Sequence, residues 1–434
     1  MFTLQGVAFL SQYQGIIRKL FQETIQMVNQ KRMAEKKQGE SVEVDFPYDV
    51  RKQIRRSFIL IMRSPFIDRV PILVSLIRYF AEKGYKVDIL SPTDPNYMEP
   101  TFLTNKIKFT KIRQNVRVFG SKFRFPVSIG LVFEGCKNIL RFRPPFILGG
   151  DNFGNIIAGL LATTFRIPLV THCLELPAVR TASMSKRDQL EHFFIRRSDL
   201  VLTHDLQRAD FICRQTGVDK GKIEIIANGS LGKAKRHDSK YLREALCLDK
   251  GKIILLHSGG FGRWFKCLEL ALAAGAWPKD WCLVFHTSHK VDSTQYYCDF
   301  NRSIKSANIL VHDAPVPDAD LDQLVSSAHI GIALYSREEL GFRADLMGLA
   351  AGKIGRYLKN GVPVIATDLP TVKAYISKYS CGLCVEKEED IFDAVRHILN
   401  NYQSYCINAL RCYDELWSTE QYCETIISNV AHFK

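Results

Sequence analysis

The sequence predicts an α/β protein with two domains, each built on a parallel sheet. Three features support this fold class. The chain has 434 residues, enough for two domains with a buried core in each. Residues 57–90 show the pattern strand, helix, strand, the crossover that parallel strands need. Residues 252–276 repeat the order strand, loop and helix in the second half.

The composition is that of a globular protein, with 46% hydrophobic and 24% charged residues. The net charge of +14 suits a polyanion, an anionic membrane surface or a phosphorylated small molecule. Basic residues cluster before residue 60 and around 105–143, without the aromatic and glycine pattern of RNA-binding modules. We therefore expect no nucleic-acid partner and favour peripheral contact with an anionic membrane.

The twelve cysteines are scattered, mostly within apolar segments. The pair Cys381 and Cys384 has the Cys-x-x-Cys spacing but lacks the second pair of a zinc site, so a reducing compartment is favoured. The sequence contains neither an apolar run of spanning length nor a basic region ahead of an apolar one at its start. The expected location is cytoplasmic, peripheral on the inner face of the membrane.

Residues 1–50 are predicted to be a helical extension and a linker. Apolar residues recur at helical spacing over residues 1–33, and residues 33–50 are charged. This amphipathic helix could lie on a membrane or dock on the rest of the protein, and docking is the simpler interpretation.

The first domain is predicted over residues 51–230. A continuous apolar strand at 57–62 precedes a loop and a helix at 70–83, which Gly84 ends. The loop contains Ser64 and Arg69 and lacks the glycine fingerprint of a dinucleotide site, which argues against NAD or FAD.

Polar residues follow two later strands of this domain. Asp151 ends a strand before a helix at 152–165, and His172 and Glu175 follow the apolar run from residue 168. Because ligands bind at the carboxyl ends of parallel strands, these three residues are candidates for a site. The alternative for His172 is a buried structural role. Asn228-Gly229 ends the domain, and the basic segment to about residue 252 is the expected hinge.

The second domain is predicted over residues 231–415. Its first strand leads into the glycine-rich loop 258–266 and then a helix. Such a loop can hold a diphosphate on backbone N–H groups, with Gly259, Gly260, Arg263 and Lys266 as candidate contacts. His286 ends the next strand.

The stretch 348–367 gives the most specific signal. Small residues lead to Gly352-Lys353 at the start of an amphipathic helix, Asn360-Gly361 ends it, and residues 362–366 form a buried strand. Free N–H groups at a helix start, together with a lysine, suit a nucleotide's phosphates. The alternative is a helix entry kept small for packing.

This stretch resembles the donor-binding element of the retaining family 4 glycosyltransferases with the GT-B fold. The motif is Lys-hydrophobic-x-x-Tyr-Leu-x-x-Gly-x-Pro-Val-Ile, and it is filled here by Lys353, Ile354, Tyr357, Leu358, Gly361, Pro363, Val364 and Ile365. Many members carry two glutamates where this chain has Gly348 and Arg356, so the ribose contact of the second glutamate is missing. Asn228-Gly229 resembles the family's Pro-Asn-Gly turn, with Ala227 in the proline's place.

The resemblance implies two Rossmann-like domains facing a central cleft, and a terminal helix at 416–434 that is a candidate to cross back to the first domain. It implies retaining transfer of a sugar from a nucleoside diphosphate sugar, with UDP or GDP, to a glycan, lipid-linked or other hydroxyl acceptor. Cations would replace a metal, so neither metal nor cofactor is expected.

The resemblance also implies roles for the candidate residues. The expected catalytic group is His172, Glu175, Lys266 and Lys353. The expected donor-binding group is Gly259, Gly260, Arg263, His286, Gly352 and Arg356. The expected acceptor side is Ser64, Arg69 and Asp151.

Two other interpretations bear on the chemistry. Asp318-Ala319-Asp320 has the Asp-x-Asp pattern of metal-dependent transferases, but it precedes a predicted helix at 321–328, so helix capping is favoured. The alternative functions are a nucleotide-sugar 2-epimerase and a non-catalytic GT-B-like partner subunit, the latter suggested by the missing glutamates.

Overall fold

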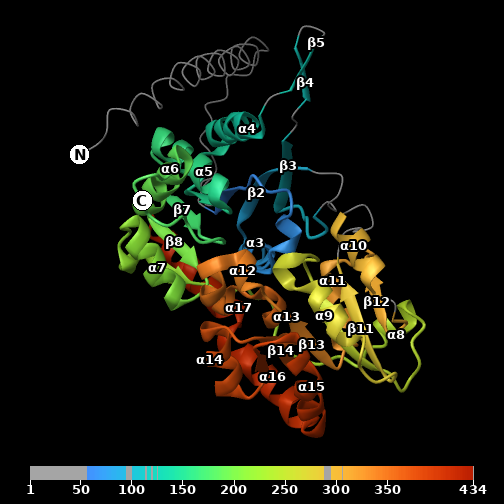
Figure 1. The fold of residues 1–434 in the computed structure, drawn as a ribbon. Coiled ribbons are helices and arrows are strands. Elements are labelled where there is room, and N and C mark those ends of the chain that lie inside the picture. Colours follow the sequence, from blue (N-terminus) through green and yellow to red (C-terminus); the bar gives the residue numbers. More distant parts are fainter. Residues whose placement is uncertain are drawn as a thin grey trace, which may run out of the picture.

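The fold places two α/β domains one above the other (Figure 1). The computed structural model describes residues 56–93, 100–112, 115–118, 121–124, 126–287, 295–304 and 306–433. The extension predicted over residues 1–50, with its amphipathic helix, lies outside the described residues.

The first domain contains, within the described residues, a seven-stranded parallel sheet in the order β3-β2-β1-β6-β7-β8-β9. Its strands are β1 (Ser57–Ile61), β2 (Lys86–Pro92), β3 (Ile107–Ile112), β6 (Phe146–Gly149), β7 (Leu169–His172), β8 (Leu200–Thr203) and β9 (Ile223–Ile225). Its helices are α3 (Pro71–Glu82), α4 (Val127–Phe142), α5 (Asn152–Phe165), α6 (Lys186–Arg197) and α7 (Leu206–Thr216). An antiparallel hairpin adds β4 (Asn115–Val118) and β5 (Ser121–Arg124).

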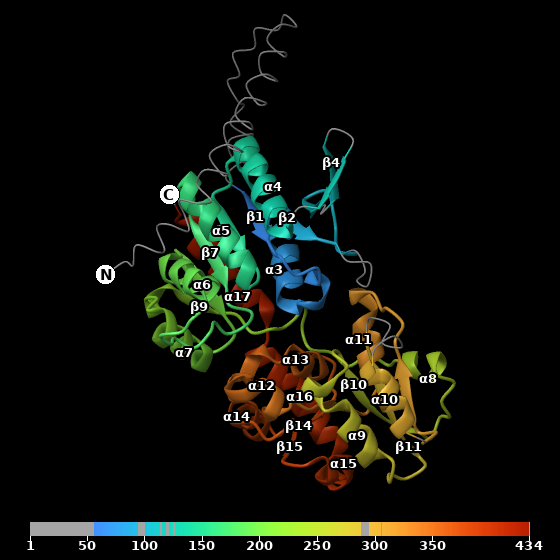
Figure 2. The same ribbon diagram turned by 45° about the horizontal axis from the view of Figure 1, so that its top comes forward.

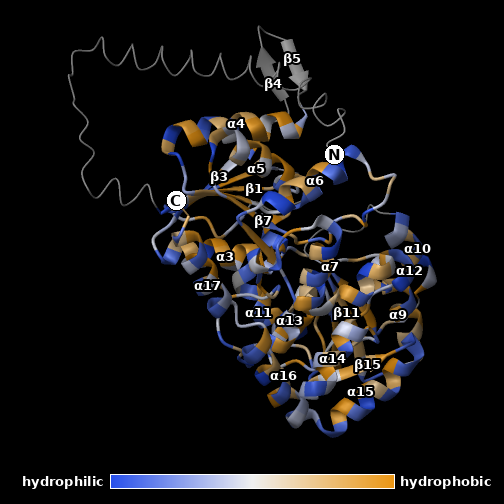
Figure 3. Cartoon of the chain, turned by 90° about the vertical axis from the view of Figure 1, so that its left-hand side faces the viewer, coloured by the Kyte–Doolittle hydropathy of each residue, from blue (hydrophilic) through white to orange (hydrophobic). Residues whose placement is uncertain are grey.

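Strand β1 shows why the strands of this sheet are continuous apolar runs in the sequence. Phe58 and Leu60 pack in the core layer that contains α3, whereas Ile59 and Ile61 pack in the layer that contains α4 and α5. Side chains alternate across a strand, so a sheet covered on both faces needs apolar residues at every position. In Figure 3 the strands of this sheet are coloured mainly as hydrophobic and many outer helix turns as hydrophilic.

The second domain contains, among the described residues, a six-stranded parallel sheet in the order β12-β11-β10-β13-β14-β15. Its strands are β10 (Ile253–Ser258), β11 (Trp281–His286), β12 (Ile309–His312), β13 (Ile330–Ala333), β14 (Val364–Thr367) and β15 (Gly382–Val385). Its helices are α8 (Tyr241–Ala245), α9 (Cys267–Ala274), α10 (Gln295–Ser303), α11 (Asp318–Ser326), α12 (Arg337–Leu340), α13 (Gly352–Lys359), α14 (Pro370–Tyr379), α15 (Ile391–Asn400) and α16 (Tyr402–Leu416). The strand order reverses beside β10, which is where open parallel sheets form a ligand crevice.

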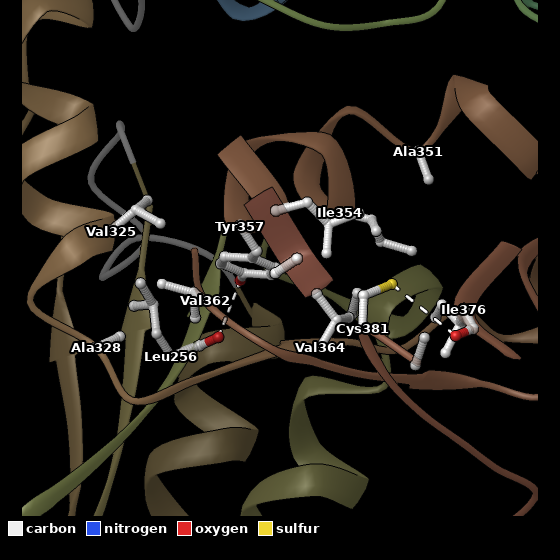
Figure 4. Packing of buried hydrophobic residues seen from close by; sticks show 14 of the residues in the cluster. Leu256, Val325, Ala328, Ala351, Ile354, Tyr357, Val362, Val364, Ile376 and Cys381 are labelled. Carbon is white, nitrogen blue, oxygen red and sulfur yellow. Dashed lines mark hydrogen bonds between the residues drawn. The ribbon is translucent and has the colours of Figure 1, made fainter. Parts of the chain in front are cut away.

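Tyr357 fastens α13 to the end of β10. Its hydroxyl donates to the carbonyl oxygen of Leu256 at 2.9 Å, as Figure 4 shows, and accepts from the N–H of Ser258 at 2.7 Å. The side chain is completely buried among the apolar residues of this core. The start of α13 is therefore held next to the loop that follows β10.

The last helix, α17 (Thr419–Ala431), lies against α3 of the first domain (Figure 2). Ile426 is buried in the first domain's core, and the Tyr79 hydroxyl donates to a Glu424 carboxylate oxygen at 2.5 Å. The return crossing lies beside the outgoing one, because Thr419 Oγ1 donates to the carbonyl oxygen of Ser230 at 3.2 Å. Two neighbouring crossings leave the domains joined along one edge.

None of the helices that the structure describes is both long enough and apolar enough to span a bilayer. All twelve cysteines carry free thiols.

Candidate functional site

A cleft of about 770 Å³ lies between the two domains. The first domain contributes polar groups that follow β1, β7 and β8 or lie in the connection to the second domain: Asp68, Arg69, Glu175, His204, Arg208 and Asn228. The second domain contributes residues that follow β10, β11 and β13 or begin α11 and α13: Gly259, Gly260, His286, Asp318, Tyr335, Gly352, Lys353 and Arg356. The carboxyl ends of both sheets thus line one cavity, as expected for paired parallel sheets.

Lys353 lies where the two predicted loops of the second domain meet. It is the second residue of α13, and its Nζ is 3.0 Å from Nε2 of His257 at the end of β10. Gly259 has φ +130°, and a Cβ at this position would lie 3.2 Å from Cε of Lys353. The Phe265 ring centroid is 4.4 Å from the ammonium. The glycine-rich loop and the start of α13 therefore enclose one cation.

The ammonium of Lys353 has no ion-pair partner within the part of the chain that the structure describes. Burial lowers its pKa to about 7. Burial and the nearby Lys353 hold the pKa of His257 well below its usual range, so this imidazole stays neutral. The first two N–H groups of α13, those of Gly352 and Lys353, also lack partners within the helix, whereas that of Ile354 donates to the carbonyl oxygen of Ala351 at 2.9 Å. An anion at this corner would restore the lysine's charge and accept from these N–H groups.

The glycines here also serve packing, so the alternative interpretation is partly correct. A Cβ at Gly260 would lie 2.1 Å from the Phe265 ring, and one at Gly352 would lie 2.8 Å from Nδ2 of Asn228. Asn228 Nδ2 in turn donates to the carbonyl oxygen of Ala350 at 3.0 Å across the domain boundary. Small residues at these positions are therefore needed for packing against Phe265 and Asn228, and they also leave the backbone open to a ligand.

Arg356 stands at one of the two positions where many family members carry a glutamate. It forms ion pairs with two carboxylates of α11. Its Nη2 is 3.0 Å from Oδ1 of Asp318, and its Nη1 is 3.4 Å from Oδ1 of Asp322. Burial alone would lower the pKa of Arg356, but the two carboxylates raise it above its usual value. Position 356 thus carries a positive charge in this chain. The carboxylate next to it belongs to Asp318, which also lines the cleft.

The capping interpretation of the Asp-x-Asp triplet is wrong for Asp318. Helix α11 begins at Asp318 itself, its N-cap is Pro317, and no side chain caps it. The carboxylate binds Arg356 and lies 3.9 Å from Arg78 of the first domain.

Gly348 stands at the other glutamate position. The space that a side chain would need there is filled by Asp205 of the first domain. The φ of Gly348 is +35°, and a Cβ there would lie 2.2 Å from Oδ2 of Asp205. That carboxylate caps α7 and accepts from the N–H of Leu349 at 3.1 Å. A side chain at residue 348 would displace this contact between the domains.

His286, Arg69 and Glu175 line the cleft as predicted. His286 Nδ1 lies 2.9 Å from the Ser258 hydroxyl oxygen. Burial and the neighbouring His312 lower the pKa of His286 to about 3, so the ring is neutral. Glu175 is exposed on the first-domain wall.

His172 requires a correction. Its side chain is 1% exposed and is not part of the cleft wall. Neither ring nitrogen has a hydrogen-bond partner among the described residues, and the ring lies edge-on to that of His204 at 5.2 Å. Burial lowers its pKa to about 3. His172 is therefore a neutral residue behind the cleft. His204 is the first-domain histidine that borders the cleft, although its side chain is also fully buried.

Lys266 and Arg263 require a second correction. The ammonium of Lys266 is 2.7 Å from Oε1 of Glu388, and Lys266 lines a smaller cavity on the second domain. Arg263 is exposed, and neither residue belongs to the cleft wall. Of the two lysines expected in the catalytic group, Lys353 alone lines the cleft, so the fold does not bring both of them to one diphosphate.

Asp151 and Ser64 bind each other and do not line the cleft. Asp151 caps α5, with Oδ1 accepting from the N–H of Gly154 at 2.6 Å, and its Oδ2 accepts from the N–H of Ser64 at 2.8 Å. Neither residue lines the cleft. Their predicted acceptor contact is replaced by a role in shaping the loop after β1.

Several cleft residues were missed by sequence reasoning. His204 and Arg208 follow β8, and Tyr335 follows β13, so the rule of strand ends could have found them. Arg208 donates through Nη2 to the carbonyl oxygen of Leu174 at 2.7 Å and through Nη1 to that of Leu346 at 3.4 Å. It thus links the two domains at the cleft floor.

The comparisons with known proteins agree with this architecture. Residues 72–230 match the model of Glycosyltransferase Family 4. No curated protein is significantly similar in sequence.

Among solved structures, Anabaena HepE in complex with UDP-glucose is 12% identical, with a TM-score of 0.65 over 86% of this chain and 99% of that one. Sucrose-phosphate synthase from Thermosynechococcus elongatus is 16% identical, with a TM-score of 0.64 over 86% and 98%. A Listeria monocytogenes protein thought to be a UDP-N-acetylglucosamine 2-epimerase is 12% identical, with a TM-score of 0.57 over 87% and 96%.

The fold is therefore GT-B, two Rossmann-like domains with parallel sheets facing a cleft. Residues 72–230 are similar to a Glycosyltransferase Family 4 domain, and this match lies within the first of the two domains.

Proposed function

We propose that this enzyme transfers a sugar from a UDP- or GDP-sugar to a hydroxyl of a glycan or lipid-linked acceptor, with retention at the anomeric carbon and without a metal ion. The observation that carries the proposal is the position of Lys353. It lacks an ion pair among the described residues and lies between the glycine-rich loop and the start of α13. The UDP-glucose complex of the structurally similar HepE supports a nucleotide-sugar donor.

The transfer step breaks the bond between the anomeric carbon and a diphosphate oxygen, so negative charge grows on the departing diphosphate. Lys353, the first N–H groups of α13 and the backbone at Gly259 are placed to stabilise that charge. A fixed cation in such a site contributes on the order of a few kcal/mol to transition-state stabilisation. No metal is needed in this proposal because the protein's own cation neutralises the leaving group.

The nucleoside is proposed to bind toward β11 and α11. His286 and Asp318 line this end of the cleft, and Arg356 holds Asp318 in place. A carboxylate that also faces the cleft can accept from ribose hydroxyl groups. Asp318 would thus supply the carboxylate that the chain lacks at residue 356.

The acceptor is proposed to bind against the first domain, where Glu175 and Arg69 line the cleft. Glu175 can accept from a sugar or acceptor hydroxyl, and Arg69 can donate. Peripheral contact with an anionic membrane on its cytoplasmic side remains part of the proposal, motivated by the net charge of +14.

A nucleotide-sugar 2-epimerase is the second candidate. The Listeria monocytogenes protein shares the fold, and Asp68, Glu175 and Glu339 add carboxylates to the cleft. An epimerase interconverts its substrate without an acceptor, whereas a transferase releases nucleoside diphosphate faster when an acceptor is present. A non-catalytic partner subunit would do neither.

A screen of UDP-, GDP- and ADP-sugars, with release of nucleoside diphosphate as the readout, tests the proposal. Wild-type protein should hydrolyse at least one donor, and Lys353→Ala should lower turnover by about a hundredfold or more. Lys378→Ala, which removes an exposed lysine of α14, is the matched control and should behave as wild type. Near-normal turnover of Lys353→Ala would remove this residue from the site, and sugar epimerisation without nucleotide release would identify the second candidate.

A further inference from the structure

Trp264 is turned outward by the packing of its neighbour. It is the middle residue of a short 3₁₀ turn, η3 (Arg263–Phe265), in the glycine-rich loop. Successive side chains of a 3₁₀ turn point about 120° apart. Phe265 is directed inward, under the Lys353 ammonium and into the space next to Gly260. With Phe265 inside, Trp264 faces solvent.

The exposure of Trp264 is unusual for its position. The side chain is 53% exposed, and among the large hydrophobic side chains exposed in the described residues it is the one that lines the cleft. Other members of that group, such as Leu206 and Ile407, lie outside the cleft wall. A large aromatic ring left open at the mouth of a site is typical of a contact surface.

The backbone of Trp264 is bound to the start of α12. The Ser336 N–H donates to the carbonyl oxygen of Trp264 at 2.9 Å, and the Ser336 hydroxyl accepts from the Glu339 N–H as the cap of α12. Glu339 and Arg343 also line the cleft. The loop that carries the indole is therefore anchored against α12, and a carboxylate and a guanidinium line the same cleft.

A pyranose ring matches this combination of groups. One face of the ring presents C–H groups that can lie flat on an aromatic face, while its hydroxyls reach outward to hydrogen-bonding partners. Carboxylate and guanidinium groups are such partners. An alkyl chain would gain from the indole but nothing from Glu339 and Arg343.

The strand order places Trp264 and the proposed nucleoside site at different ends of the cleft. Strand β10, next to Lys353, has β11 on one side and β13 on the other. His286 ends β11, whereas α12 follows β13. If the nucleoside extends over β11 from a diphosphate at Lys353, the sugar and its acceptor extend over β13 toward the cleft mouth at Trp264.

We infer that Trp264 is the stacking surface for a pyranose ring of the acceptor, so that the acceptor is a glycan rather than a plain lipid alcohol. This inference rests on the proposed function and deepens it, because it adds a second-domain contact to the acceptor site proposed along the first domain in the same cleft. Loss of the indole should weaken acceptor binding by at least about tenfold, because a well-placed tryptophan is among the residues whose truncation costs most.

Acrylamide quenching of tryptophan emission tests the inference on the full chain. Trp264 is 53% exposed, Trp281 and Trp417 are buried and Trp277 is half-buried, so Trp264 should give most of the accessible emission and Trp277→Phe removes the second contribution. The protein is first saturated with UDP and then titrated with methyl pyranosides, disaccharides or octanol. At least one saccharide should protect the emission of wild-type protein and of Trp277→Phe, and should leave that of Trp264→Phe unchanged.

Each outcome has a defined meaning. Protection by octanol and by no saccharide, protection that persists in Trp264→Phe, or no protection at all would overturn the inference. Protection by UDP-glucose alone, equal to that with acceptor sugars, would place the donor sugar on Trp264 and also overturn it. Failure of UDP to bind, measured first by calorimetry, would instead count against the proposed function. Where a saccharide is also a substrate, Trp264→Ala should raise the KM for that acceptor more than the KM for the donor.

Discussion

Donor binding should take up a proton at Lys353. In the free enzyme burial lowers the pKa of Lys353 to about 7. A diphosphate at the ammonium favours the charged form and raises that pKa toward or beyond the ordinary lysine value. Because the bound state holds more protons, affinity is greatest below pH 7 and falls as the pH rises from 7 toward the bound-state pKa.

The size of the effect follows from the fraction of charged lysine. About half of Lys353 is charged at pH 7 and about 3% at pH 8.5, so the Kd for a UDP-sugar should rise about 15-fold, or about 1.6 kcal/mol. The groups that face Lys353 do not titrate in this window. His257 is neutral, burial raises the pKa of the Cys267 thiol to about 11, and burial raises the pKa of Tyr335.

Isothermal titration calorimetry in buffers of different ionisation enthalpy measures the uptake directly. We expect about one proton per UDP-sugar at pH 8.5 and about a tenth of a proton at pH 6. Lys353→Gln should bind more weakly and lose both the uptake and the pH dependence, whereas Lys378→Gln should keep both. An affinity that is flat from pH 7 to 8.5, with no proton taken up, would refute the reasoning.

Two further predictions concern the positions of the missing glutamates. Asp318→Asn should weaken UDP binding about tenfold and lower the free energy of unfolding by about 1–3 kcal/mol, because the largely buried Arg356 loses one of its two carboxylates. Asp320→Asn on the same helix is the control. Equal effects of the two changes in calorimetry and denaturant unfolding would contradict the assignment. Gly348→Glu, which restores the family residue, should destabilise the protein by about 3 kcal/mol or more without raising activity, because residue 348 has φ +35° and the Asp205 carboxylate occupies the space of its Cβ. Thermal unfolding measures this loss against Gly251→Ala, where a Cβ meets nothing within 4 Å, and a stable, more active Gly348→Glu would show that the family's site can be rebuilt.

The sheet elements could be predicted closely because parallel strands covered on both faces are apolar throughout. The predicted helix at 152–165 coincides with α5, and the predicted strands at 57–62 and 362–366 overlap β1 and β14. Amphipathic elements on the outside, such as α6 and α16, were not predicted, because their charged faces interrupt the apolar pattern. Helix α11 begins at Asp318, three residues before the predicted start.

The candidate site could be predicted most closely where the backbone itself forms it. Gly259, Gly352 and Lys353 meet because a glycine-rich turn and a helix start are local features of the sequence. Side-chain direction depends on distant partners. Lys266 binds Glu388, 122 residues later in the chain. His172 ends the correct strand, yet its ring points into the protein toward His204.

The central claim is that the cleft holds a nucleotide's diphosphate at Lys353. A crystal structure of the enzyme with UDP or a UDP-sugar tests it most directly. We expect the diphosphate within hydrogen-bonding distance of Lys353 Nζ and of N–H groups at Gly259 and the start of α13, with the nucleoside toward His286 and Asp318. A diphosphate bound beside Lys266 and Glu388, or anywhere outside the interdomain cleft, would contradict the account.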